Sequence, residues 1–158
     1  MFLGKALVQI VHGMTEHMGR YEKLAEILIR DGIAVAGFDL RGHGKTTKDM
    51  TCASFGENGW ETTIKEIHQF HDLMKQRFGE VKHYLLGFSL GSFLVREYFS
   101  NYDNCDFAGT IIMGTGQQPA LILSAIMLIV KGEIKKVGFD STTDLVRKIY
   151  IELVEKNK

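Results

Sequence analysis

A pentapeptide with glycine at both ends and serine at its centre, Gly87-Phe88-Ser89-Leu90-Gly91, joins a strand-like run at 81–86 to a helix-like run at 93–99. A serine at a tight turn from strand to helix is held in a strained backbone conformation, which small flanking residues permit. Its hydroxyl then stands clear of the sheet, with a helix N-terminus beneath it. The pattern predicts a nucleophile elbow suited to acyl transfer. The alternative is an ordinary turn in which the two glycines relieve crowding and the serine caps the helix.

Apolar strand-like runs alternate with amphipathic helical runs along the first two thirds of the chain. The expected strands are residues 6–11, 33–39, 81–86 and 107–113, and the expected helices are residues 21–31, 60–78 and 90–102. This alternation indicates βαβ units, and therefore a parallel sheet of about four strands with three crossover helices covering its two faces. The predicted fold class is α/β.

Glycine-rich and polar segments follow three of the expected strands. They are His12-Gly13, Asp39 to Gly44, and Gly87 to Gly91. In open parallel sheets ligands bind outside the carboxyl ends of the strands. We therefore expect three loops to converge on one edge of the sheet and to form the site there.

The pattern changes after Met113, where two helices without further strands are expected, at 119–131 and 143–156. The first is apolar nearly all round, with the only proline of the chain at its start. The second is preceded by Ser141-Thr142-Thr143-Asp144, which resembles a capping box. We expect residues 1–118 to form the core and residues 119–158 to form a partial helical cap that is not an independent domain.

Charge and composition exclude several classes of partner. Lysine plus arginine and aspartate plus glutamate both number 19, so no net field attracts nucleic acid. The first five residues lack the pattern of a secretory signal, and Cys52 and Cys105 do not suggest a disulfide framework. The longest apolar run, 120–130, is about half of the ~20 residues that span a bilayer. The expected location is the cytoplasm.

Two patterns resemble cofactor sites without satisfying their requirements. His68 and His71 have helical i, i+3 spacing, but His71 shares an apolar stripe and no third metal ligand is evident. Gly42 to Thr46 ends like a phosphate-binding loop, yet Asp39 stands where that motif needs its first glycine and would repel phosphate. We expect no metal and no other cofactor, and a nucleotide-binding module is the weakest reading.

Three ordered motifs carry a resemblance to a known family. They are Val11-His12-Gly13-Met14-Thr15-Glu16-His17 with Gly19-Arg20-Tyr21 after it, Phe38-Asp39-Leu40-Arg41-Gly42-His43-Gly44, and the serine pentapeptide. Together they resemble the monoacylglycerol lipase and lysophospholipase group of α/β-hydrolases, also called the serine aminopeptidase S33 group, over approximately residues 5–119. The resemblance implies a carboxylic-ester hydrolase acting on a single acyl chain attached to glycerol or to a glycerophosphate head group.

The resemblance also implies site residues. Ser89 is the expected nucleophile, and the backbone N–H groups of Met14 and Leu90 form the expected oxyanion hole. Each such amide, aimed at the charge of a tetrahedral intermediate, is worth on the order of 3 kcal/mol. The expected supporting loop positions are His12, Gly13, Glu16, His17, Gly87 and Gly91. Glu16 and His17 are expected to brace the loop and to help cap the helix that follows it.

One departure from the family pattern concerns the acid and the base. The family order is serine, acid, histidine, whereas all six histidines here precede Ser89. Asp140 and Asp144 follow the serine but lie where the family has a lid. We expect a piece of the fold, short at both ends, that holds the nucleophile and the oxyanion hole. His12 and His43 are alternative bases.

These features define the expected partners and the alternative function. The expected substrate is a small acyl ester or lysolipid, with at most peripheral membrane contact through the cap. A sheet that ends at residues 107–113 leaves an unpaired edge, so self-association through it and marginal stability are expected. The alternative function is a catalytically silent fragment or pseudoenzyme that binds an acyl chain or a protein partner through residues 120–130.

Overall fold

The computed structural model describes residues 4–47, 54–103, 106–138 and 143–155. They divide into two compact units, one ending at Gly116 and the other beginning at Gln117. Cys52, Cys105, Asp140 and the first half of the expected capping box, Ser141-Thr142, lie outside the described residues.

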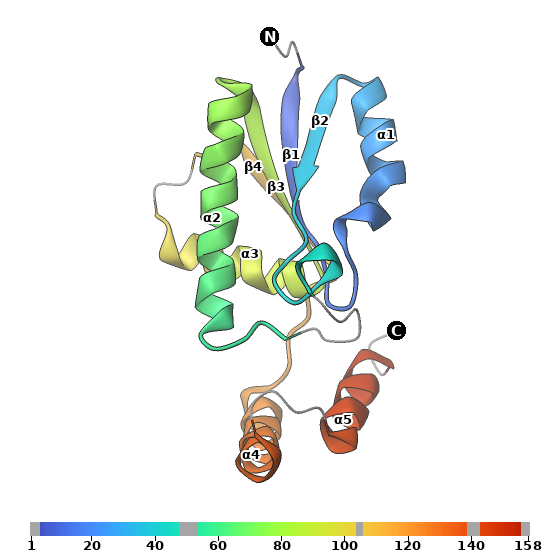
Figure 1. Ribbon diagram of the computed structural model, residues 1–158, viewed down its shortest axis with the longest axis vertical. Helices are drawn as coiled ribbons and strands as arrows, with labels where there is room; N and C mark the ends of the chain where they lie inside the picture. Colours follow the sequence, from blue (N-terminus) through green and yellow to red (C-terminus); the bar gives the residue numbers. More distant parts are fainter. Residues whose placement is uncertain (1–3, 48–53, 104–105, 139–142, 156–158) are drawn as a thin grey trace. The chain divides into compact units, whose positions relative to one another are not determined.

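The first unit is built on a parallel four-stranded sheet with the order β2-β1-β3-β4 (Figure 1). The strands are β1 (Ala6–Val11), β2 (Ile33–Gly37), β3 (Lys82–Phe88) and β4 (Gly109–Met113). This arrangement confirms the predicted α/β class. β3 extends two residues beyond the expected 81–86, because Phe88 pairs with Met113 at the end of β4. β2 is two residues shorter than expected.

The helices of this unit cover both faces of the sheet (Figure 1). They are α1 (Glu22–Arg30), α2 (Gly59–Phe78) and α3 (Leu90–Asn101), with short 3-10 helices η1 (Met18–Tyr21) and η2 (Gly44–Thr46) in the loops. Successive residues of β1 point to opposite faces, so Val8 and Ile10 pack toward α1 while Leu7 and Val11 pack on the opposite side. Each face therefore has its own apolar core.

The core under α2 and α3 contains more buried residues than the core under α1. Ile64 and Ile67 of α2 and Leu94 and Val95 of α3 are buried around Leu85 of β3. The apolar stripe expected over 60–78 is the buried face of α2, which ends at Gly79 with φ 69°. This packing fixes the start of α3 against the carboxyl ends of the strands.

The second unit contains α4 (Ala120–Val137) and α5 (Asp144–Glu155). α4 ends six residues later than the expected 119–131. It continues through Gly132, where a helical glycine costs only about 1 kcal/mol, and ends at Gly138 with φ 88°. Within the described residues, no helix combines the length and the hydropathy that a bilayer crossing requires.

Candidate active site

Ser89 occupies the turn between the last residue of β3 and the first residue of α3, with φ 51° and ψ −115°. This backbone conformation is rare for a residue with a side chain and costs on the order of 1–3 kcal/mol. The Ser89 side chain makes no capping hydrogen bond to α3. A helix-capping role therefore does not explain why the turn carries a serine.

Three hydrogen bonds hold the Ser89 backbone in this conformation. Its N–H donates to the Met113 carbonyl at 2.9 Å, and its own carbonyl accepts from the Ser92 N–H at 2.9 Å and the Ser92 hydroxyl at 2.6 Å. Ser92 is completely buried. The end of β4 and the first turn of α3 thus fix the serine from both sides.

The two glycines of the pentapeptide are required by close backbone contacts. A Cβ added to Gly91 would stand 2.0 Å from the Val11 carbonyl oxygen, and one added to Gly87 would stand 2.5 Å from the Gly91 oxygen. No larger residue fits at either position without movement of the backbone. The start of α3 therefore lies directly against the end of β1.

The loop after β1 lies beside the serine. A Cβ on Gly13 would be 3.2 Å from the Ser89 Cβ, and Thr15, two residues later, has φ 56°. Within the described part of the chain, no hydrogen bond from the Met14 N–H is found. The Leu90 N–H is the first of α3, where a helix has no internal acceptor. Two backbone N–H groups without an acceptor among the described residues therefore lie near Ser89. One belongs to Leu90, the next residue, and the other belongs to Met14, in the adjacent loop.

The side chain of Glu16 braces this loop. Its Oε1 accepts the Gly13 N–H at 2.5 Å and the Tyr21 hydroxyl at 2.7 Å, and its Oε2 lies 3.2 Å from an Arg20 nitrogen. Burial and this hydrogen bond raise the pKa of Tyr21, so its hydroxyl remains a donor. The sequence motif contains Arg20 and Tyr21 but did not predict them as partners of Glu16, although their i+4 and i+5 spacings from it were an available signal.

The side chain of His17 does not share this role. It is exposed and makes no capping hydrogen bond, contrary to the expected cap. Only its backbone carbonyl contributes, by accepting the Arg20 N–H at 3.1 Å. The loop therefore depends on the carboxylate of Glu16.

His12 joins the loops after β1 and β2. Its Nδ1 lies 2.7 Å from the Gly13 carbonyl and donates to it, while its Nε2 accepts the Leu40 N–H at 2.9 Å. These partners fix the neutral tautomer, and burial lowers the pKa of the ring. Because both ring nitrogens are engaged, His12 cannot take the Ser89 proton in this arrangement.

Asp39 adds a second bridge between the same loops. Its two oxygens accept the N–H groups of Met18 and Lys45, each at 2.8 Å. Burial opposes ionisation, but the bonds from Lys45 and Met18 outweigh it and hold the pKa of Asp39 below its ordinary value. A carboxylate that accepts two backbone N–H groups holds these loops together.

The other candidate base, His43, is buried beside His12, with ring centroids 5.4 Å apart. Its Nδ1 lies 2.9 Å from the Arg41 carbonyl, and its Nε2 is buried without a partner among the residues that the structure describes. Within the described residues no histidine forms a hydrogen bond to Ser89. Nor do those residues bring three potential metal ligands together.

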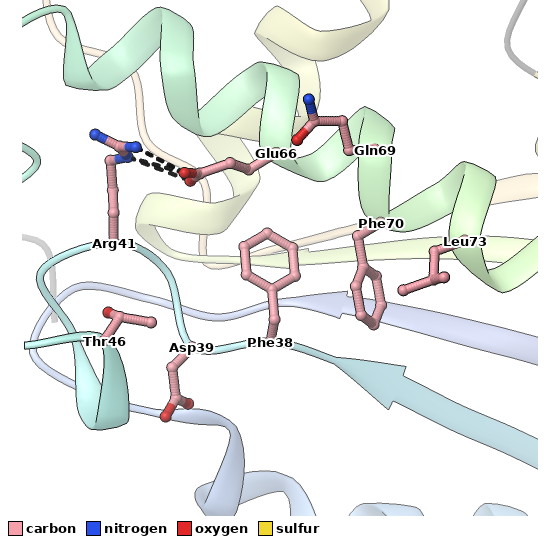
Figure 2. A pocket seen from close by; sticks show the side chains of 8 residues that line it. All are labelled: Phe38, Asp39, Arg41, Thr46, Glu66, Gln69, Phe70 and Leu73. Atoms are coloured by element: carbon pink, nitrogen blue, oxygen red, sulfur yellow. Dashed lines mark hydrogen bonds and ion pairs between the residues drawn. The ribbon is translucent and has the colours of Figure 1, made fainter.

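A hollow of about 390 Å³ lies elsewhere, between α2 and the loop that follows β2 (Figure 2). Its apolar part is formed by Phe38, Phe70 and Leu73. Its lining also includes Arg41 and Glu66, which form an ion pair of 2.7 Å. Arg41 also donates to the Phe55 carbonyl at 3.1 Å. None of the eight lining residues belongs to the turn at Ser89 or to the loop beside it, so the hollow is separate from the candidate site.

The chain is similar to known proteins. A family model described as serine aminopeptidase, S33, matches residues 4–147. Monoglyceride lipase of Rattus norvegicus is 32% identical over 87 residues, which are 55% of this chain and 27% of that protein.

Two solved structures are also similar. One is a carboxyl esterase from Bacillus coagulans in complex with glycerol, with a TM-score of 0.74 and 26% sequence identity. The match covers 94% of this chain and 46% of the esterase chain. The other is the monoacylglycerol lipase of Paleococcus ferrophilus, with a TM-score of 0.56 and 30% sequence identity. That match covers 80% of this chain and 48% of the lipase chain. The chain thus spans less than half the length of each of these three relatives.

The contact between Gly91 and the Val11 carbonyl gives a direct test of this packing. Gly91→Ala should lower the free energy of unfolding by about 3 kcal/mol, because the new methyl group forces α3 away from β1. Gly132→Ala is the matched control in a helix, since a Cβ there meets nothing within 4 Å. It should raise stability by about 1 kcal/mol or less. Urea unfolding followed by circular dichroism measures both, and equal values for the two variants would contradict the packing described.

Proposed function

The chain belongs to the serine aminopeptidase S33 family, and on that premise we propose that it is a carboxylic-ester hydrolase of the monoacylglycerol lipase or lysophospholipase type, with Ser89 as its nucleophile. The observation that carries the proposal is the strained backbone of Ser89 at the turn from β3 to α3, beside Gly13. Strain at this one position places the hydroxyl outside the sheet, where a substrate carbonyl can approach. The monoglyceride and monoacylglycerol lipases among its relatives support the acyl-ester substrate class.

In this mechanism the hydroxyl of Ser89 attacks the ester carbonyl, and the N–H groups of Met14 and Leu90 stabilise the resulting oxyanion. Their lack of internal acceptors supports this role. Gly13 leaves room for the substrate between the loop and the serine, and Glu16 holds the loop from behind by its bond to the Gly13 N–H. Preorganised donors of this kind lower the barrier without reorganising during the reaction.

The proton of Ser89 needs an acceptor for efficient turnover. Since His12 is engaged at both ring nitrogens and no histidine follows Ser89, we assign no base among the described residues. An oxyanion hole and substrate binding alone leave a residual acceleration on the order of 10³ over water. We propose that efficient turnover depends on an acid and a histidine supplied from outside this sequence.

The neighbourhood of Ser89 suits an acyl chain. Met14, Phe88 and Met113 are large apolar side chains that remain 38%, 37% and 48% exposed around the serine turn. A Cβ on Gly114 would touch the Phe88 ring at 3.3 Å, so this ring lies beside the end of β4. Exposed apolar groups next to a nucleophile favour a lipid-like ester over a polar one.

α4 provides a second apolar surface. Leu121 and Leu128 are 83% and 75% exposed, and Lys131, Lys135 and Lys136 follow near its C-terminal end. We propose that α4 acts as part of a cap that contacts an acyl chain or, peripherally, a lipid surface. Apolar residues joined to basic ones fit the interface of a membrane that carries anionic lipid.

The free edge of β4 supports a proposal of self-association. Within the described residues, β4 has a strand neighbour on one side alone, and Ile111 and Ile112 on its two faces are 42% and 37% exposed. An exposed apolar edge is a template for pairing with a second copy of the chain. We propose that two copies associate through this edge.

The nucleophile can be tested with a fluorophosphonate probe, which reacts with activated serines. We expect slow labelling of the folded chain that falls to background in Ser89→Ala, because the oxyanion hole alone gives only residual activation when no base is assigned. Ser100→Ala, an exposed serine of the same helix, is the matched control and should keep full labelling. Folded protein that takes up no probe would instead support the catalytically silent alternative.

The role of α4 can be tested with Ile126→Ser and Ile129→Ser combined. If α4 contacts the acyl chain, binding of a fluorescent fatty acid should weaken about tenfold, the scale of losing roughly 1.4 kcal/mol of apolar contact. Ile27→Ser with Ile29→Ser in α1, where both side chains are exposed, is the control and should leave binding unchanged. Unchanged binding with lower thermal stability in the α4 variant would show that these residues serve packing alone.

The edge proposal predicts that Ile111→Lys weakens self-association. A charge on the edge strand opposes strand pairing, and the dissociation constant of the dimer should rise about tenfold or more. Ile29→Lys, at an exposed position of α1, is the control. Sedimentation equilibrium measures the constants, and a wild-type chain that is monomeric at all concentrations would refute the proposal.

A further inference from the structure

A cluster of ionisable side chains lies at the opposite end of β3 from Ser89. It comprises His71 and Lys75 of α2, His83 of β3 and Asp106 in the segment that leads to β4. His71 and His83 are only 2% and 4% exposed. The proposed hydrolase mechanism uses none of these groups, yet burying two imidazoles in contact requires a physical explanation.

Asp106 fixes the proton positions of both rings. The His71 Nε2 lies 2.8 Å from Asp106 Oδ1, and because a carboxylate only accepts, this nitrogen carries the proton. A neutral His71 then has a bare Nδ1, which faces the His83 Nδ1 at 3.4 Å. The His83 Nδ1 must therefore donate. Its Nε2 is left as a bare acceptor, buried without a partner among the described residues.

The pair can take up one proton and keep its shared hydrogen bond. A proton on His71 Nδ1 makes that ring a cation beside the Asp106 carboxylate, and His83 accepts the reversed bond once its own proton moves to Nε2. A second proton would place an N–H on each of the two facing nitrogens and a buried cation on His83. Since a buried charge without a partner is costly, the folded pair excludes it.

We propose that the His71–His83 pair is an acid-sensitive latch, which holds α2 to the first residues of β3 and to the segment before β4 and opens when both rings become protonated. The ring of Phe107 packs against His71 with centroids 4.0 Å apart, so opening also exposes apolar surface. The latch depends on geometry that the structure shows directly, and it does not require the hydrolase function.

Several charged groups surround the pair. Asp106 is paired with Lys75 and His71, and these two partners hold its pKa well below the ordinary range. Lys75 in turn faces Asp72 and Glu80. His68, one turn before His71, is bound to the Tyr98 hydroxyl at 2.9 Å and lies 3.8 Å from Asp72.

The pKa of His83 determines the direction of the effect. Burial first, and the neighbouring His71 second, lower it from its ordinary 6.5. The unfolded chain then binds more protons than the folded chain below that pH. Stability is therefore full above about pH 6.5 and is lost as the pH falls through 6.5 toward the folded pKa of His83.

The latch contacts the start of β3 and the segment just before β4, and the far ends of these two strands hold the serine. β3 runs from His83 to the turn at Ser89, and β4 runs to Met113, whose carbonyl accepts the Ser89 N–H. Opening at one end of these strands should loosen the other. Any consequence for catalysis rests on the proposed function, whereas the latch can be tested without activity.

The first experiment follows the imidazole nitrogens of the ¹⁵N-labelled chain by NMR from about pH 8 to about pH 5. We expect the His83 ring to stay neutral until the chain begins to unfold. At neutral pH, proton-bearing nitrogens should be Nε2 of His71 and Nδ1 of His83. Titration of His83 near its ordinary pKa in the folded chain would overturn the proposal.

The second experiment uses His83→Asn, because the asparagine amide can donate to His71 Nδ1 but does not titrate. The drop in Tm between about pH 7.5 and about pH 5.5 should shrink by about 3 °C. His17→Asn, at an exposed histidine, is the matched control and should keep the wild-type drop. His12, which is also buried with a lowered pKa, leaves part of the drop in every variant.

Hydrogen exchange, corrected for the intrinsic pH dependence, locates the opening. In the wild type, residues 71–78 and 107–113 should lose protection on acidification before the centre of β1 does, and His83→Asn should delay that loss. A His83→Asn variant with the wild-type pH dependence would refute the latch. If that variant does not fold, the NMR titration of the wild type decides alone.

Discussion

The close approach of the Gly91 backbone to the Val11 carbonyl is the contact on which the arrangement of the site depends. A methyl group at Gly91 would stand 2.0 Å from that oxygen. Because residue 91 is a glycine, α3 can begin directly at the edge of the sheet. The turn that precedes α3 then brings Ser89 next to Gly13. Both loops that meet at the candidate site are therefore positioned by a backbone contact, and the glycine that permits it carries no chemistry of its own.

Backbone strain gathers at the same place. Among the described residues, the non-glycine residues with positive φ are Thr15, Asn58 and Ser89, and two of these three lie in the facing loops of the site. Strain of this kind persists only where the surroundings determine the backbone more strongly than its own preference. Here the surroundings are polar: Glu16 binds the Gly13 N–H from within its loop, and Ser92 binds the Ser89 carbonyl. Because these buried acceptors have hydrogen-bond donors, their burial carries little penalty in free energy, and the loops are held in one conformation.

Local patterns in the sequence predicted much of this, because period and turn chemistry act over a few residues. The alternation of strands and helices gave the α/β class, and the serine pentapeptide was placed correctly at the end of β3. The tautomer of His12 and the pairing of His71 with Asp106 could not be predicted, since they depend on partners 28 and 35 positions away in the sequence. The sequence predicted that the helix ends just before Gly132. A single glycine does not end it, and α4 continues to Val137.

The register of β3 determines what surrounds the residues at both of its ends. Side chains alternate between faces, so His83 and Leu85 point toward α2 and α3, while Tyr84 and Leu86 point toward α1. A slip by one residue would expose the wrong set on each face and would separate His83 from His71. It would also move Ser89 away from the Met113 carbonyl. The apolar packing that fixes the register of β3 therefore determines both the histidine pair at its beginning and the serine turn at its end, so a change to either core face should be felt at both.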